Sequence, residues 1–230
     1  MLRVVVAALL ACGCVVLRAA PDARAEPVKL VFDRDATGAA PAGFSTDVTN
    51  GPPGTWVVEA DTTATGGKVL VQRSTDPTSG RFPLCIYDGV SARDVVVTVR
   101  FKPISGEEDR AAGIVWRYRD SGNYYVVRAN ALEGNVVLYE VEAGKRRDLK
   151  PIGAGMLAYG KKVDVPSGAW STLRVEANDA RFAVSLDGRH LFDVEDDTFR
   201  EPGRVGLWTK ADSVTAFDDL EIEPRDAASR

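Results

Sequence analysis

The chain has 230 residues, with 29 Lys and Arg against 33 Asp and Glu, and a formal net charge of −4. This acidic balance argues against nucleic acid as a partner, because phosphate contacts need a basic surface. The chain has one His, and one Cys beyond residue 25, so a zinc site of clustered His and Cys ligands is excluded.

The first 25 residues have the pattern of a secretory signal peptide. Arg3 precedes an apolar run over residues 4–17, and Ala23-Arg24-Ala25 is a small-x-small cleavage site. Cleavage after Ala25 removes three Arg and one Asp, which leaves 26 basic and 32 acidic residues and a net charge of −6. We therefore expect an exported protein, periplasmic or secreted; a lipoprotein signal ending at Cys12 is the alternative. The apolar run is too short for a good transmembrane span and no later run reaches membrane length, so no membrane span is expected.

The rest of the chain reads as short strands separated by turns. Alternating or β-branched segments predict strands at 28–32, 55–59, 68–72, 81–87, 94–103, 113–119, 124–130, 136–141, 170–177, 182–186, 191–194, 205–209 and 216–222. We expect Asp187-Gly188 to form a hairpin turn, residues 145–162 a long loop, and residues 197–202 a single helical turn. The pattern predicts an all-β fold, a two-sheet antiparallel β-sandwich of jelly-roll type. Residues 26–224 are expected to form one domain, with residues 225–230 as a tail.

The segment 111–142 carries most of the aromatic and polar residues. Alternation predicts Ile114, Trp116 and Tyr118 on one face of a strand, with Arg117 and Arg119 on the other. We assign Trp116 to the core, and expect Trp170 to be buried in its own strand as well.

Several of these strands resemble a known family. The segments 112–118, 124–128, 170–175, 184–188, 203–208 and 217–222 are similar to successive strands and turns of concanavalin A-like jelly rolls. More narrowly, they resemble the domain named for 3-keto-disaccharide hydrolases, a laminin-G-like sandwich, over about residues 28–223. The resemblance implies a carbohydrate ligand and a hydrolase or lyase activity on 3-keto-glycosides. We expect no cofactor and assign no metal ligand; the resemblance leaves room for a structural calcium, for which Asp33, Asp35, Asp218 and Asp219 would be the candidate ligands.

The sequence departs from that family on one strand. Where family members often show a Tyr-Glu-x-Gln type run, the acid position falls on Val126 and the amide position on Arg128. We therefore assign no catalytic residue from the resemblance.

The candidate ligand-binding residues are polar and aromatic side chains on strands expected to lie side by side. Arginine and asparagine suit sugar hydroxyls or a carboxylate, and aromatic rings stack on sugar rings. The candidates are Arg117, Tyr124, Arg128 and Asn130, joined by Trp208 and Lys210. The alternative is structural: Trp208 packs between the sheets, and the arginines are solvated or pair with Glu140 and Glu142.

Acid–base residues are harder to find. Glu140 and Glu142 point the same way on one strand, as a glycosidase pair would, but the third acid of the laminarinase-type strand is missing. His190 follows a turn with nothing nearby to orient it as a base.

Three functions remain open at this point. The first is a monomeric, exported carbohydrate-recognition module. The second is a hydrolase or lyase acting on 3-keto-glycosides or related sugars, and the third is a non-catalytic protein-interaction module of the cell envelope.

Overall fold

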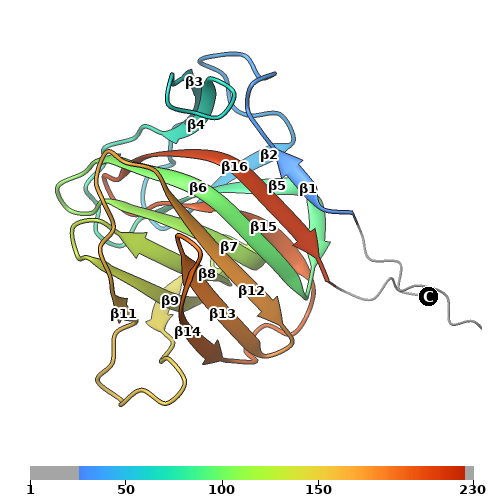
Figure 1. Cartoon of the computed structure of the whole chain (residues 1–230), viewed down its shortest axis with the longest axis vertical. Helices are drawn as coiled ribbons and strands as arrows, with labels where there is room; N and C mark the ends of the chain where they lie inside the picture. Colours follow the sequence, from blue (N-terminus) through green and yellow to red (C-terminus); the bar gives the residue numbers. More distant parts are fainter. Residues whose placement is uncertain (1–25, 226–230) are drawn as a thin grey trace, which may run out of the picture.

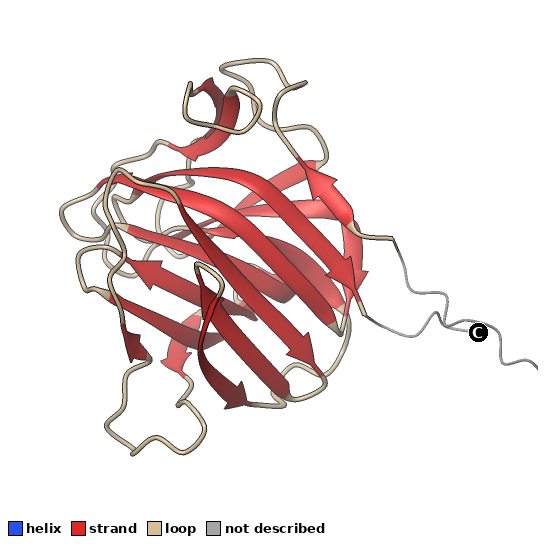
Figure 2. Cartoon of the chain, in the orientation of Figure 1, coloured by secondary structure: helices blue, strands red, loops and turns tan. Residues whose placement is uncertain are grey.

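The computed structural model describes residues 26–225, and these residues form strands, turns and loops without an α-helix (Figure 2). No helix in this range is long and apolar enough to cross a membrane. The expected signal peptide and residues 226–230 of the expected tail lie outside the described residues.

The strands form two antiparallel sheets that pack face to face (Figure 1). Sheet 1 has the order β14-β13-β12-β6-β16-β4-β3, with β1 beside β16. Its strands are β1 (Val28–Leu30), β3 (Trp56–Ala60), β4 (Lys68–Gln72), β6 (Val95–Ser105), β12 (Ser171–Asn178), β13 (Arg181–Leu186), β14 (Arg189–Glu195) and β16 (Val214–Pro224). Sheet 2 has the order β10-β9-β8-β7-β15-β5-β2, with β11 beside β9. Its strands are β2 (Phe44–Thr49), β5 (Phe82–Ala92), β7 (Ala111–Asp120), β8 (Asn123–Asn130), β9 (Asn135–Glu142), β10 (Lys145–Asp148), β11 (Lys161–Lys162) and β15 (Gly203–Trp208).

The main core lies between the sheets, where alternate residues of facing strands meet. Trp116 of β7 is fully buried there, stacked on Tyr125 and in edge contact with Phe182. Cys85 is buried in the same core, which raises the pKa of its thiol and keeps it protonated. The predicted two-sheet sandwich and the core position of Trp116 are therefore confirmed.

Some predicted elements differ in the structure. The expected loop 145–162 begins with β10 and ends with β11, both of which pair with β9. Residues 197–202, expected as a helical turn, are a bend in an irregular connection, and β2 was not predicted at all. The Asp187-Gly188 hairpin is confirmed, with positive φ of 50° and 74° as a type I′ turn requires.

A β-bulge changes the predicted alternation on β7. Pairing with β8 shifts register between Trp116 and Asp120, and Arg117 has φ of 49°. As a result Arg117 lies over the core ring of Phe182, while Tyr118 joins a separate cluster on the other face of sheet 2. The prediction that Tyr118 shares a face with Trp116 was therefore wrong, because strict alternation does not survive the inserted residue.

The outer face of sheet 2, turned away from sheet 1, carries that second apolar cluster. Tyr124, Val126 and Tyr139 belong to it, together with Phe82 and Trp208. Arg128 and Asn130 follow Tyr124 and Val126 at alternate positions of β8, so the strand places them at the edge of this cluster.

Candidate functional site

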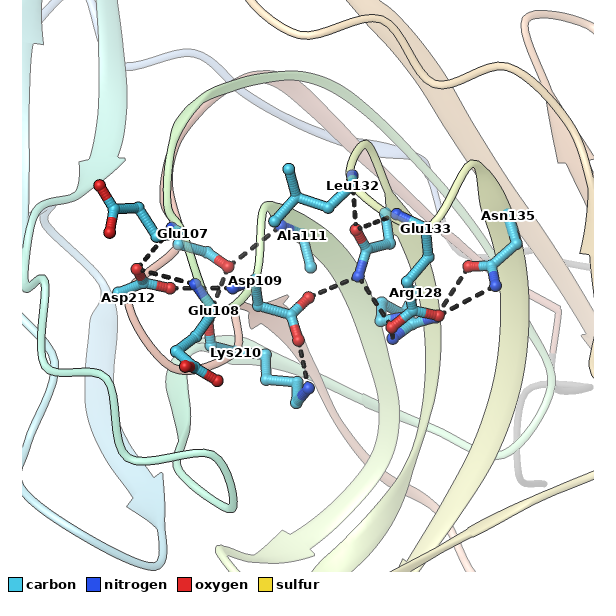
Figure 3. Close-up of polar contacts among 12 residues, drawn as sticks. Glu107, Glu108, Asp109, Ala111, Arg128, Leu132, Glu133, Asn135, Lys210 and Asp212 are labelled. Carbon is cyan, nitrogen blue, oxygen red and sulfur yellow. Dashed lines mark hydrogen bonds and ion pairs between the residues drawn. The ribbon is translucent and has the colours of Figure 1, made fainter.

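The candidate site is built around an ion pair at the end of β8. Arg128 donates from Nη1 to Oε1 of Glu133 at 2.9 Å and from Nη2 to Oε2 at 2.7 Å (Figure 3). Arg128 also donates to Oδ1 of Asn135 at 2.8 Å, and Asn135 donates to Glu133 at 3.0 Å. Arg128 is fully buried, and its Nε has no hydrogen-bond partner among residues 26–225. The guanidinium is therefore fixed in orientation, and its Nε–H donor is left without a partner in this range.

Asn130 shapes the turn that carries Glu133. Its Oδ1 accepts the backbone N–H groups of Leu132 at 2.9 Å and Glu133 at 3.1 Å, which closes an Asx-type turn between β8 and β9. Its Nδ2 donates to Oδ1 of Asp109 and, at 3.3 Å, to Glu133. Asn130 is 1% exposed, so its role in this arrangement is to position the two carboxylates.

A second ion pair links the loop before β7 to the loop after β15. Asp109 accepts Asn130 on one oxygen and the ammonium of Lys210 on the other (Figure 3). The segment holding Asp109 is anchored by Asp212, which accepts the backbone N–H groups of Glu107, Glu108 and Asp109 at 2.6 to 3.1 Å. Burial acts to raise the pKa of Asp212, but these three hydrogen bonds outweigh it and the pKa is lowered.

We name the six polar residues of this site the Arg128 cluster. They are Asp109, Arg128, Asn130, Glu133, Asn135 and Lys210.

Tyrosine rings border the Arg128 cluster. The ring centroids of Tyr139 and Tyr159 lie 5.6 Å and 5.9 Å from the Arg128 guanidinium carbon, and the two tyrosine hydroxyls are 2.5 Å apart. Tyr159 is 42% exposed and the side chain of Glu133 is 37% exposed. A ring and a carboxylate therefore face solvent above a buried, oriented guanidinium.

The charge state of Glu133 limits its chemistry. Partial burial acts to raise its pKa, but the hydrogen bonds and charge of Arg128, with help from Asn135 and Lys210, lower it to about 2. At neutral pH Glu133 is thus an ionised acceptor that suits hydroxyl groups, whereas a general acid needs a raised pKa.

Three of the predicted ligand residues lie apart from the Arg128 cluster. Arg117 is 1% exposed and donates to the backbone oxygens of Arg93 at 2.9 Å, Phe199 at 2.7 Å and Asp179 at 2.5 Å. These bonds tie loops together at the opposite end of β7, and the expectation that Arg117 and Arg128 share one face is not met.

The buried aromatics Tyr124 and Trp208 lie in the floor of the outer face. The Tyr124 hydroxyl is 2.7 Å from Oγ1 of Thr49, and the Trp208 ring centroid is 5.2 Å from that of Phe82. Both residues are 0% exposed, so neither presents a free ring to solvent. Of the six predicted residues, the structure brings together Arg128, Asn130 and Lys210.

The paired acids considered from sequence do not form an acid–base couple. Glu140 is 4% exposed and accepts Arg147 Nε at 2.6 Å and Thr198 Oγ1 at 2.8 Å, while Glu142 is exposed. Glu140 thus fastens β10 and the 196–199 connection to β9.

No metal-binding cluster is visible within residues 26–225, where no three His, Cys, Asp or Glu side chains are grouped to share an ion. Of the candidate calcium ligands, Asp218 lies 3.6 Å and Asp219 3.0 Å from Arg100, and both accept from Thr65. The structural calcium therefore stays a prediction.

Sequence reasoning missed Asp109, Glu133, Asn135 and Tyr159. Glu133 and Asn135 lie between two predicted strands and were not among the candidates, although an Asn followed three residues later by an acid is the signal of a side-chain-supported turn. Asp109 and Tyr159 lie in loops, and only tertiary contacts bring them to β8.

The chain is thus a jelly-roll sandwich with a polar cluster at the end of β8, and its sequence matches a known family. Residues 29–223 match the model of the 3-keto-alpha-glucoside-1,2-lyase-like domain. The chain therefore belongs to this family. A search of curated proteins gave no match.

Solved structures share the fold. The carbohydrate-binding module CBM66 from Bacillus subtilis superposes with a TM-score of 0.61 at 24% identity, covering 79% of this chain and 95% of that chain. Domain 4 of AbnA, a GH43 extracellular arabinanase from Geobacillus stearothermophilus solved with arabinotriose, gives 0.53 at 15% identity, covering 85% and 90%. The cellulose induced protein Cip1 gives 0.59 at 14% identity, covering 85% and 96%.

Proposed function

We propose that this protein is an exported carbohydrate-recognition module that binds a glycan at the Arg128 cluster. The observation that carries the proposal is the Arg128–Glu133 pair, a rigid two-point donor and acceptor set with a half-exposed Tyr159 ring beside it. Vicinal sugar hydroxyls act as donor and acceptor at once, so an oriented carboxylate–guanidinium pair matches them. An adjacent ring supplies apolar contact to the faces of the sugar.

The unpartnered Nε of Arg128 supports the same proposal. A buried donor without a partner is costly, and a ligand oxygen reaching it would recover a charge-assisted hydrogen bond. Lys210, whose side chain is 15% exposed, offers further donor capacity at the other end of the cluster.

Similar folds give independent support for a carbohydrate ligand. Two of the solved relatives are described as a carbohydrate-binding module and as an arabinanase domain in complex with arabinotriose. That arabinanase is extracellular, which agrees with the signal peptide expected in residues 1–25.

A second candidate is the lyase chemistry in the family's name. Elimination from a 3-keto-glycoside needs a base that removes the proton beside the keto group. Within the Arg128 cluster the carboxylates are Glu133, with a pKa of about 2, and Asp109, which is 1% exposed and paired with Lys210. Glu133 is too weak a base for this step, and Asp109 is buried and already paired, so the cluster favours glycan binding over turnover.

The test is a binding and turnover screen on the purified protein. Isothermal titration calorimetry against arabinan, levan, cellulose oligomers and uronate polymers should give saturable binding, lost in Glu133→Ala while Glu142→Ala, an exposed acid outside the cluster, keeps it. Chromatography of the same mixtures, and of a 3-keto-disaccharide, should show no product. Product release that depends on Asp109 or Glu133 would replace the binding function with the lyase function, and absence of both binding and turnover would overturn the proposal.

A further inference from the structure

Arg146 of β10 is a cation on the outer face of sheet 2, and none of the described residues is its acidic partner. Its guanidinium carbon lies 4.3 Å from the ring centroid of Tyr139 and 5.0 Å from that of Phe82. It forms no ion pair within residues 26–225, and its Nη1 is buried without a hydrogen-bond partner in that range. Arg128 is compensated by Glu133 and Lys210 by Asp109, so Arg146 leaves this part of an acidic protein with an unmatched positive charge.

The ring contacts of Arg146 do not use its N–H donors. A guanidinium lying over aromatic rings is supported through its face, whereas its N–H groups lie in the plane of the group and form hydrogen bonds at its edge. A partly buried charge without a counterion is unfavourable, and an incoming anion would remove that cost. The planar fork of N–H groups fits a carboxylate through two parallel hydrogen bonds.

Arg146 also lies next to the Arg128 cluster. Tyr139 is the shared neighbour, since its ring centroid is 4.3 Å from the Arg146 guanidinium carbon and 5.6 Å from that of Arg128. Burial raises the pKa of Tyr139, and the charges of the two arginines act in the opposite direction. A sugar seated on Glu133 and Arg128 would therefore be close enough for Arg146 to bind a substituent on it or on the next residue.

We propose that the glycan bound on this face is acidic, and that Arg146 binds the carboxylate of a uronic acid residue. This inference rests on the proposed carbohydrate-binding function and specifies the class of sugar. Nothing covalent is involved: the carboxylate stays ionised and supplies the negative charge that Arg146 does not receive from residues 26–225.

Arg119 provides a matched control. It too lies over a ring, with its guanidinium carbon 5.3 Å from the centroid of Phe199, but it is exposed and has no buried unpartnered nitrogen. Its donors are open to solvent, so it should not contribute to glycan binding.

The experiment compares uronate polymers with their carboxyl-reduced forms, which keep the ring and the linkage but lose the charge. Polygalacturonate, alginate and hyaluronan are titrated into the full protein by calorimetry at two salt concentrations. At least one uronate polymer should bind, at least tenfold more tightly than its reduced form and more weakly at high salt. Equal binding of both forms, or binding of neutral glycans alone, would overturn the acidic-sugar inference and leave the carbohydrate function standing. Absence of binding to every glycan would overturn both.

Two variants assign the effect to Arg146. Arg146→Met keeps an aliphatic chain over the rings and should lose the preference for the uronate form, whereas Arg119→Met should keep it. Arg146→Lys keeps the positive charge but loses the planar set of N–H donors, and it replaces the methionine variant if that variant does not fold. The lysine variant should bind uronate polymers more weakly, with unchanged affinity for the reduced polymers. An unchanged preference in a folded Arg146 variant contradicts the inference.

Discussion

Arg128 and Glu133 form a two-point ion pair across the turn from β8 to β9, with N···O distances of 2.9 Å and 2.7 Å. Arg128 is fully buried and Glu133 is partly exposed, so the pair extends from buried side chains of sheet 2 to the solvent. We expect this pair to stabilise the turn and, in the proposed function, to contact the glycan.

Glu133→Gln should destabilise the protein by about 1–3 kcal/mol, because it removes the negative charge that compensates a buried guanidinium. Urea denaturation measures the change, with Glu142→Gln as the control. Glu142 is exposed, and its substitution should stay within about 0.5 kcal/mol of the wild type. Equal effects in the two variants would mean that the ion pair adds nothing to the fold.

The stabilisation from Glu133 should depend on pH in a defined direction. Its pKa falls from 4.5 to about 2 in the folded protein, so its contribution is complete above pH 4.5 and is lost as the pH drops through about 2. The difference in unfolding free energy between wild type and Glu133→Gln should therefore be constant from pH 7 to 5 and shrink at lower pH. A difference that already falls between pH 7 and 5 would show that Glu133 titrates higher than the structure implies.

Arg117→Met should destabilise the fold by about 3 kcal/mol or more, since it leaves the carbonyl oxygens of Arg93, Phe199 and Asp179 without their buried donor. Glycan affinity of the folded fraction should not change. Arg119→Met, two positions along the same strand, is the matched variant and should leave the melting temperature nearly unaltered. Loss of glycan binding in a stable Arg117→Met protein would restore Arg117 to the ligand site.

Replacing Trp116 or Trp170 by Ala should lower the free energy of unfolding by different amounts. Trp116→Ala removes a fully buried core ring and should cost about 3–5 kcal/mol. Trp170 was expected in the core, but it is partly exposed, lies against Arg100 and Lys102 at 4.8 Å and 4.9 Å, and donates to Thr63. Its substitution by Ala should cost about 1–2 kcal/mol, since cation–π contacts at such sites are modest. Equal losses on denaturant unfolding would place Trp170 in the core after all.

Tyr159→Ala should weaken glycan binding several-fold with little change in unfolding free energy, because the ring is 42% exposed and borders the Arg128 cluster. Leu157→Ala, which truncates a 99% exposed side chain of the same loop, should leave binding unchanged. Calorimetric titration measures the glycan affinity of both variants. Similar losses of affinity in both would point to the loop as a whole rather than to the tyrosine ring.

Much of the fold could be predicted because alternation and turn residues determine local structure. Apart from β10 and β11, the strands from Val95 onward and the Asp187-Gly188 turn follow from strand patterns and turn residues in the sequence. The bulge at Arg117 could not be predicted, since one inserted residue leaves the composition of the strand unchanged while changing the face of the sheet on which the following side chain lies.

The candidate site was predicted only where its residues lie on a strand. Arg128 and Asn130 are two apart on β8, so alternation places them on one face. Asp109, which accepts from Asn130, lies 21 residues before it, and Lys210, which pairs with Asp109, lies 101 residues after Asp109. Only the pairing of β7 with β15 brings these charges together.

The most direct measurement is the nuclear magnetic resonance signal of the Arg128 Nε–H group, followed while a binding oligosaccharide is added to isotope-labelled protein. If the Arg128 cluster binds the glycan, this signal and the backbone signals of Glu133, Tyr159 and Lys210 should shift together and saturate at one affinity. A rival depression of about 450 Å³ lies near Ile152, Lys161 and Phe192. Shifts confined to that depression, with the Arg128 signal unmoved at saturation, would contradict the assignment of the site.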